Sequence, residues 1–83
     1  MLYGAGKCGQ YYIQKLAGQA EIVAWVDRDY VYIPHIYCME ISSPDCIKDV
    51  DFDLLFIAIQ DKTIRQKIKE YLISYGVPNR KIF

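Results

Sequence analysis

Three glycines near the start of the chain have the spacing of a phosphate-binding turn. The segment Gly4-Ala5-Gly6-Lys7-Cys8-Gly9 matches the pattern GxGxxG without a gap. In this pattern the first glycine permits a tight turn, the second lets the backbone approach a pyrophosphate, and the third lets a helix pack closely on the sheet. The free N–H groups of that helix N-terminus favour a bound anion. We therefore expect all six residues to contribute to a nucleotide site, with Lys7 either touching a phosphate or solvated.

A carboxylate follows at the distance that the dinucleotide pattern requires. Asp27 ends an apolar segment eighteen residues after Gly9, and the pattern places an acidic partner for the ribose hydroxyls about twenty residues on. A carboxylate here disfavours a 2′-phosphate, although Arg28 could offset it, so the sequence favours NAD(H) over NADP(H). The alternatives are a solvated charge at the strand end and glycines that serve only the turn.

Two related loops fit this segment less well. A P-loop requires GxxxxGK[ST], and aligning Gly6-Lys7 with its GK places Met1 at the first glycine and Cys8 at the magnesium-binding Ser or Thr. Loops that bind S-adenosylmethionine usually have an acidic residue before the first glycine, where this chain has Leu2-Tyr3. A methyltransferase fragment is therefore a minor alternative.

The elements needed to position this turn alternate along the chain. Met1–Tyr3 predicts a short first strand, and the offsets of Gly9, Ile13, Leu16, Ala17 and Ala20 predict one face of a helix. Further strands are predicted at 21–26, 53–59 and 81–83, and a loop with an extra strand is predicted at 28–42. Ser43-Pro44-Asp45 begins a short helix, and a third helix is capped by Asp61 and stopped by Gly76 and Pro78. Such alternation predicts a Rossmann-like three-layer α/β/α fold with a short parallel sheet of about four strands.

Length and charge limit the classes of function. The 83 residues suffice for one domain, 1–83, and 53% of them are hydrophobic. We expect such a domain to cover apolar surface by forming a homo-oligomer or by docking to another domain. Ten basic and ten acidic residues cancel, so a nucleic-acid partner has little support.

Cysteine usage and hydropathy indicate the compartment. Cys8, Cys38 and Cys46 lack CxxC spacing, which predicts free thiols and no metal site. No apolar run approaches the roughly 18 residues needed to span a bilayer, and no signal peptide is evident. We expect a cytoplasmic protein without membrane insertion.

Four segments together resemble a known domain. YGAGKCGQ, AWVDRD, ISSPDCIKDVDFDLLFIAIQD and IKEYLISYGVPNRKIF are similar to the Rossmann-like nucleotide-binding domain of bacterial polysaccharide-biosynthesis proteins, including pilin-glycosylation-type sugar acyltransferases and nucleotide-sugar dehydratases. The resemblance implies binding of NAD(P) or a UDP-sugar by Gly4, Gly6, Lys7, Gly9 and Asp27. It also implies that Ala58 and Gln60, at the end of the third strand, lie beside the ligand.

One departure from that family concerns the first strand. Family members have several more residues before the glycine turn, so the resemblance implies that part of the first strand is missing or supplied by another segment. No hexapeptide repeat and no evident catalytic constellation is present, which predicts a domain that is not an enzyme by itself. A non-catalytic interaction module with a degenerate pocket is the main alternative. His35 has no evident catalytic partner nearby, and Trp25 is expected in the core.

Overall fold

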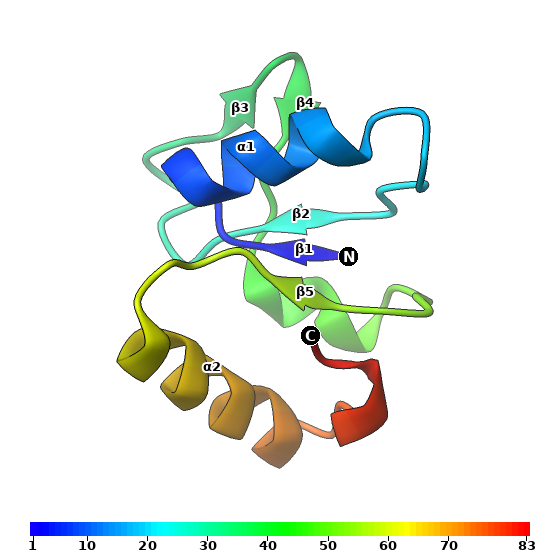
Figure 1. Ribbon diagram of the computed structural model, residues 1–83, viewed down its shortest axis with the longest axis vertical. Helices are drawn as coiled ribbons and strands as arrows, with labels where there is room; N and C mark the ends of the chain where they lie inside the picture. The colour runs from blue at the N-terminus through cyan, green and yellow to red at the C-terminus, as the bar shows by residue number, and fades with distance from the viewer.

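The computed structural model describes residues 1–83 (Figure 1). A parallel sheet has the strand order β2-β1-β5, formed by β1 (Leu2–Tyr3), β2 (Trp25–Val26) and β5 (Phe56–Ile57). Leu2 lies opposite both Trp25 and Phe56. The domain is thus α/β with a parallel sheet, as the alternation predicted, although it has three strands where about four were expected.

Single parallel bridges extend this sheet on both sides. Val26 bridges to Ser42 beyond β2, and Leu55 bridges to Ile82 beyond β5. The predicted strands at 21–26 and 53–59 are only two residues long in the structure, because each pairs with β1 and β1 offers few partners. The predicted edge strand at 81–83 is reduced to the bridge at Ile82, preceded by the 3₁₀-helix η2 (Asn79–Lys81).

Two helices flank the sheet. In Figure 1, α1 (Lys7–Leu16) lies above the three strands and α2 (Lys62–Ser74) lies below them. Residues 28–42, predicted to form a loop with one extra strand, contain an antiparallel hairpin of two strands, β3 (His35–Ile36) and β4 (Met39–Glu40). At the tip of this hairpin, Tyr37 and Cys38 have φ of 52° and 64°.

The strand residues alternate between two hydrophobic clusters. Leu2 and Trp25 pack with Ile13 of α1 in one cluster, and Trp25 is buried in the core as predicted. Their chain neighbours Tyr3 and Val26 belong to the other cluster, which contains Leu72 of α2. This alternation follows from the two-residue period of a strand.

Local capping signals define the other helix ends. The hydroxyl of Ser43 accepts the N–H of Asp45 at 3.2 Å and begins η1 (Pro44–Lys48), a 3₁₀-helix. The carboxylate of Asp61 accepts the N–H groups of Thr63 and Ile64 at 2.8 and 3.1 Å and begins α2. Both predicted helix starts are confirmed.

The C-terminus of α2 forms a Schellman motif. Gly76 has a φ of 108°, and its N–H donates to the carbonyl of Ile73 at 3.1 Å. The N–H of Val77 reaches the carbonyl of Leu72 at 3.0 Å, the pair of bonds that defines this motif. Gly76 thus ends the helix where the sequence predicted.

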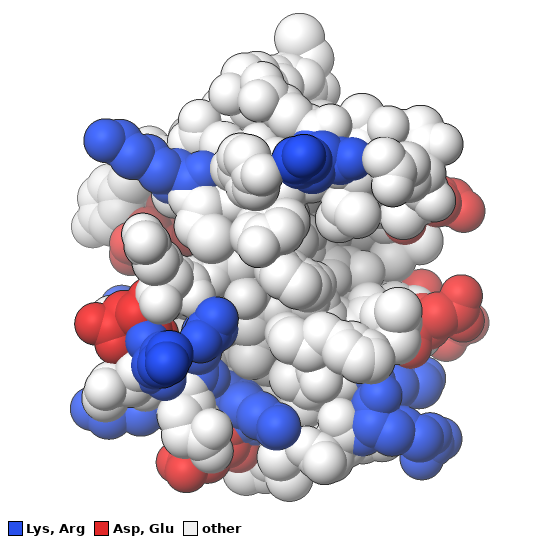
Figure 2. Space-filling view, in the orientation of Figure 1, with Lys and Arg blue, Asp and Glu red and all other residues white.

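Charged side chains surround the face shown in Figure 2, and uncharged ones occupy its centre.

None of the helices combines the length and the apolar character needed to cross a bilayer.

Candidate functional site

Two of the three glycines in the turn are required by packing. Gly4, directly after β1, has a φ of +117°, and a β-carbon there would lie 2.8 Å from the carbonyl oxygen of Ala58. A β-carbon at Gly9 would collide with the carbonyl oxygen of Gly4. Gly6 differs, because its φ is −78° and a β-carbon there would meet no atom within 4 Å.

The carbonyl groups of the turn are held from within the protein. The indole Nε1–H of Trp25 donates to the Gly4 carbonyl at 2.7 Å. The side-chain amide of Gln10 donates to the Ala5 carbonyl at 3.2 Å, and its backbone N–H donates to the Gly6 carbonyl at 2.9 Å. The acceptor side of the turn is therefore occupied.

Four of the six N–H groups of the turn are free. The N–H groups of Gly6, Lys7, Cys8 and Gly9 have no hydrogen-bond partner in the chain. No side chain caps this helix end, and its first turn contains no acidic residue. Free N–H groups and the positive end of the helix dipole together favour an anion.

Asp27 links this turn to the end of β2. One carboxylate oxygen accepts the Ala5 N–H at 2.7 Å, and the other accepts the Asp29 N–H at 2.7 Å. Each carboxylate oxygen can accept more than one hydrogen bond. The half-buried Asp27 can therefore still accept a hydrogen bond from a hydroxyl group of a ligand.

A hollow of about 800 Å³ opens beside Asp27 at the carboxyl ends of the strands. Its wall combines Asp27 and Arg28 after β2 with Tyr3 at the end of β1. The opposite wall is the face of α2 that carries Ile64, Lys67 and Tyr71. The hollow thus offers apolar surface, the three phenols of Tyr3, Tyr30 and Tyr71, and charges of both signs to a ligand.

The phenol of Tyr3 is held in its neutral form. Burial raises the pKa of Tyr3, and the nearby Tyr71 and Asp27 raise it further. A protonated hydroxyl can both donate and accept a hydrogen bond. Tyr3 therefore adds a donor to the side of the hollow that contains the Asp27 carboxylate.

The structure brings together only some of the predicted site residues. Asp27 contacts the glycine turn and lines the hollow, and the exposed Arg28 lines it too. Lys7 is exposed, and the half-buried Cys8 packs against the cluster of α1. No residue of the Gly4–Gly9 turn lines the hollow. Ala58 is buried with its carbonyl against Gly4, and Gln60 is exposed; neither of these two lines the hollow.

The contribution of α2 to the hollow was not predicted from the sequence. The helical spacing of Ile64, Ile68, Tyr71, Leu72 and Tyr75 predicts one core-facing side for this helix. In the structure Ile64 and Tyr71 are 47% and 43% exposed and line the hollow with Lys67. The helical spacing identified their face correctly. The spacing could not show that Ile64 and Tyr71 lie across the hollow from Asp27 and not over the sheet.

Other reactive side chains do not gather into a site. The chain has no group of three or more His, Cys, Asp and Glu side chains that could hold a metal ion. Its three cysteines are free thiols, and His35 is exposed on β3.

Comparison with known proteins identifies the family. A family model described as C2185-like, N-terminal, matches residues 1–83. The chain belongs to this C2185-like N-terminal family. No curated protein and no solved structure matches the chain. The resemblance to polysaccharide-biosynthesis domains stays a prediction, because the family description names no ligand or reaction.

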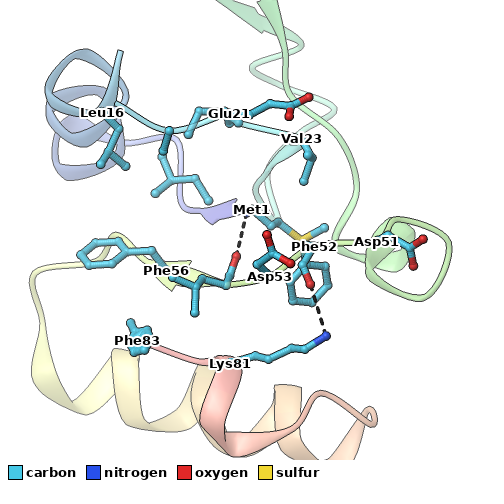
Figure 3. A pocket seen from close by; sticks show the side chains of 14 residues that line it. Met1, Leu16, Glu21, Val23, Asp51, Phe52, Asp53, Phe56, Lys81 and Phe83 are labelled. Atoms are coloured by element: carbon cyan, nitrogen blue, oxygen red, sulfur yellow. Dashed lines mark hydrogen bonds between the residues drawn. The ribbon is translucent and has the colours of Figure 1, made fainter. Parts of the chain in front are cut away.

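The C2185-like domain has a second hollow at the amino ends of the strands (Figure 3). Its volume is about 1030 Å³, and most of its lining is apolar. One wall of this hollow is formed by residues 20–23 and the other by residues 51–54. The amino group of Met1 lies between these two walls and donates to the Leu54 carbonyl at 2.8 Å. The N–H groups of Ala24 and Leu54, on either side of Met1, have no partner in the chain. This amino-edge hollow therefore has apolar walls and open strand edges, and lies at the opposite end of β1 from the glycine turn.

Proposed function

We propose that the C2185-like domain binds a nucleotide, NAD(H) or a UDP-sugar, with its phosphates on the Gly4–Gly9 turn. The fold that we propose for this role is a Rossmann-like three-layer α/β/α arrangement. The strand order across the sheet supports this arrangement. With the single bridges included, the order is Ser42, β2, β1, β5 and Ile82, which corresponds to the doubly wound order 3-2-1-4-5. The separate clusters of α1 and α2 also support it.

The observation that carries the proposal is the position of Gly6. Packing explains Gly4 and Gly9, but nothing in the fold requires a glycine at position 6. The missing side chain leaves open space beside four unpaired N–H groups. That is what a pyrophosphate needs in order to approach the backbone.

The hollow beside Asp27 suits the rest of the nucleotide. Asp27 can accept hydrogen bonds from the hydroxyl groups of a ribose, and Ile64 and Tyr71 offer apolar and aromatic surface to a base. Asp27, Asp29 and Asp45 outnumber Arg28 and Lys67 around the hollow. This balance favours a ribose without a 2′-phosphate, and hence NAD(H) over NADP(H).

The proposed role is binding, with chemistry supplied by residues outside this domain. A polysaccharide or nucleotide-sugar pathway is the setting that the sequence resemblance implies. Lys7 would approach the phosphates from the first turn of α1, where it is exposed.

A protein-interaction module is the second candidate, and Asp27 favours it. Both of its oxygens already accept backbone N–H groups, so the carboxylate has a structural role without any ligand. In that case the turn is a rigid corner of the fold, and the apolar amino-edge hollow is the more important surface.

Thermal unfolding with added ligands separates the two candidates. NAD⁺, NADP⁺, UDP, UDP-N-acetylglucosamine and S-adenosylmethionine are tested one at a time. A ligand at 100 times its dissociation constant stabilises the domain by about 2.7 kcal/mol, a shift of several degrees for a domain of this size. We expect a shift with NAD⁺ or a uridine nucleotide. A shift with S-adenosylmethionine alone would instead favour the methyltransferase alternative.

Gly6→Val provides the specific control for this experiment. A side chain at position 6 enters open space and should leave the unliganded domain folded, while blocking the phosphates. Gln14→Val, at an exposed position on α1, should keep the ligand-dependent shift. If no ligand shifts the midpoint, nucleotide binding is wrong for this chain and the interaction module is favoured.

A further inference from the structure

A single peptide unit of the glycine turn is held at both ends. The carbonyl of Gly4 and the N–H of Ala5 belong to the same planar amide. Trp25 Nε1–H donates to that carbonyl at 2.7 Å, and the carboxylate of Asp27 accepts that N–H at 2.7 Å. The amide therefore has a fixed orientation about the axis of the chain.

Both partners come from the end of β2. Trp25 lies in β2, and Asp27 directly follows this strand. Side chains two residues apart on a strand project to the same face. The spacing of Trp25 and Asp27 thus lets one strand hold the two opposite ends of one amide.

Packing alone does not account for a tryptophan at this place. Trp25 is 1% exposed, and a buried indole N–H needs an acceptor. The side chain takes this acceptor from the turn, at the carbonyl oxygen that also faces Gly9. An aliphatic residue could fill the cluster but could not hold the amide.

We infer that Trp25 is a positioning residue of the nucleotide site, which acts with Asp27 to fix the Gly4–Ala5 amide. This inference rests on the proposed nucleotide function. The fixed amide sets the direction in which the chain enters α1. The free N–H groups of Gly6, Lys7, Cys8 and Gly9 are thereby oriented before a phosphate arrives. Donors that are already oriented lose less conformational entropy on binding.

Trp25→Phe tests the inference, because it removes the indole N–H and keeps an aromatic side chain. Leu72→Val is the matched control, since Leu72 is fully buried in the other cluster. Inorganic pyrophosphate, NAD⁺ and UDP are the probes. Their dissociation constants are measured by calorimetry at a temperature where all variants are folded. Amide hydrogen exchange at Ala5 is followed by NMR on the same samples.

Trp25→Phe should weaken binding of the probe by about tenfold, the equivalent of one net hydrogen bond. Exchange at the Ala5 amide should become faster in this variant. Leu72→Val should change neither quantity. In the wild-type chain, the Nε1–H resonance of its one tryptophan should shift when the probe binds.

The failures of the two proposals differ. If the wild-type chain binds a probe and Trp25→Phe binds it equally well, the positioning role of Trp25 is wrong and the nucleotide function stands. Weakening by Leu72→Val to the same extent would also overturn this role, because the effect would be one of general stability. If the wild-type chain binds none of the probes, the nucleotide function fails and the positioning role fails with it.

Discussion

The carbonyl oxygen of Gly4 lies in the space that a β-carbon on residue 9 would occupy. The helix α1 thus begins against the backbone of the turn that precedes it, with no side chain between them. The same oxygen accepts the Trp25 indole N–H, so it has little room to move. Gly9 is consequently a structural glycine, in contrast to Gly6.

Gly9→Ala should destabilise the domain by about 3 kcal/mol or more, because the clash is with backbone atoms that are hydrogen-bonded. Gly6→Ala, in open space at a φ of −78°, should change stability by less than about 1 kcal/mol. Thermal unfolding midpoints of the two variants measure the difference. Equal midpoints would show that α1 can move away from the turn, contrary to the packing described.

The capping interaction of Asp61 is a second test of the fold. Asp61→Ala removes the acceptor for the N–H groups of Thr63 and Ile64. The loss should cost about 1 kcal/mol of unfolding free energy, measured in urea. Asp51→Ala is the control, since Asp51 is exposed and caps no helix. A cost that is the same for both variants would argue against the capping role.

Local chemistry made the helix ends predictable from the sequence. Ser43, Asp61 and Gly76 act on backbone groups within a few residues of themselves. Their side chains, or the lack of one, therefore indicate the helix end without knowledge of the rest of the chain. The same holds for Gly9, whose close contact is the carbonyl of Gly4, whereas the close contact of Gly4 is with Ala58, far along the chain.

Non-local contacts account for what the sequence did not predict. The apolar segment 21–26 has the composition of a full strand, but only Trp25–Val26 finds partners in β1. The exposure of Ile64 and Tyr71 depends on how α2 faces the end of β2. The bond from Trp25 to Gly4 joins residues 21 positions apart, and composition predicted only that this side chain is buried.

Tyr3 should make stability depend on alkaline pH. Its pKa in the folded chain is raised above the ordinary value of 10.0 by burial and by Tyr71 and Asp27. As the pH rises, Tyr3 therefore ionises in the unfolded chain before it ionises in the folded chain. The stability that comes from its neutral form is fully present below pH 10.0 and is lost as the pH rises through the pKa of the folded chain. Tyr3→Phe should lose less stability between about pH 9 and about pH 11 than the wild-type chain. Tyr32→Phe, at an 85% exposed position, should lose as much unfolding free energy over this range as the wild-type chain. Equal losses in all three chains would contradict the raised pKa of Tyr3.

The amino-edge hollow should accept added strand residues. Val-Ile joined ahead of Met1 can pair with the free N–H groups of Ala24 and Leu54 and cover apolar side chains of both walls. We expect a gain of about 1–2 kcal/mol, or roughly 4–8 °C in the unfolding midpoint for each kcal/mol, from the buried apolar area. Pro-Pro at the same place keeps the carbonyl acceptors, but it has no N–H groups to donate to the neighbouring strands and its rings fit poorly in a central strand, so it should give a smaller gain. If the two extensions raise the midpoint equally, strand pairing at this edge is not the cause, and if neither raises it, the hollow does not accept a strand.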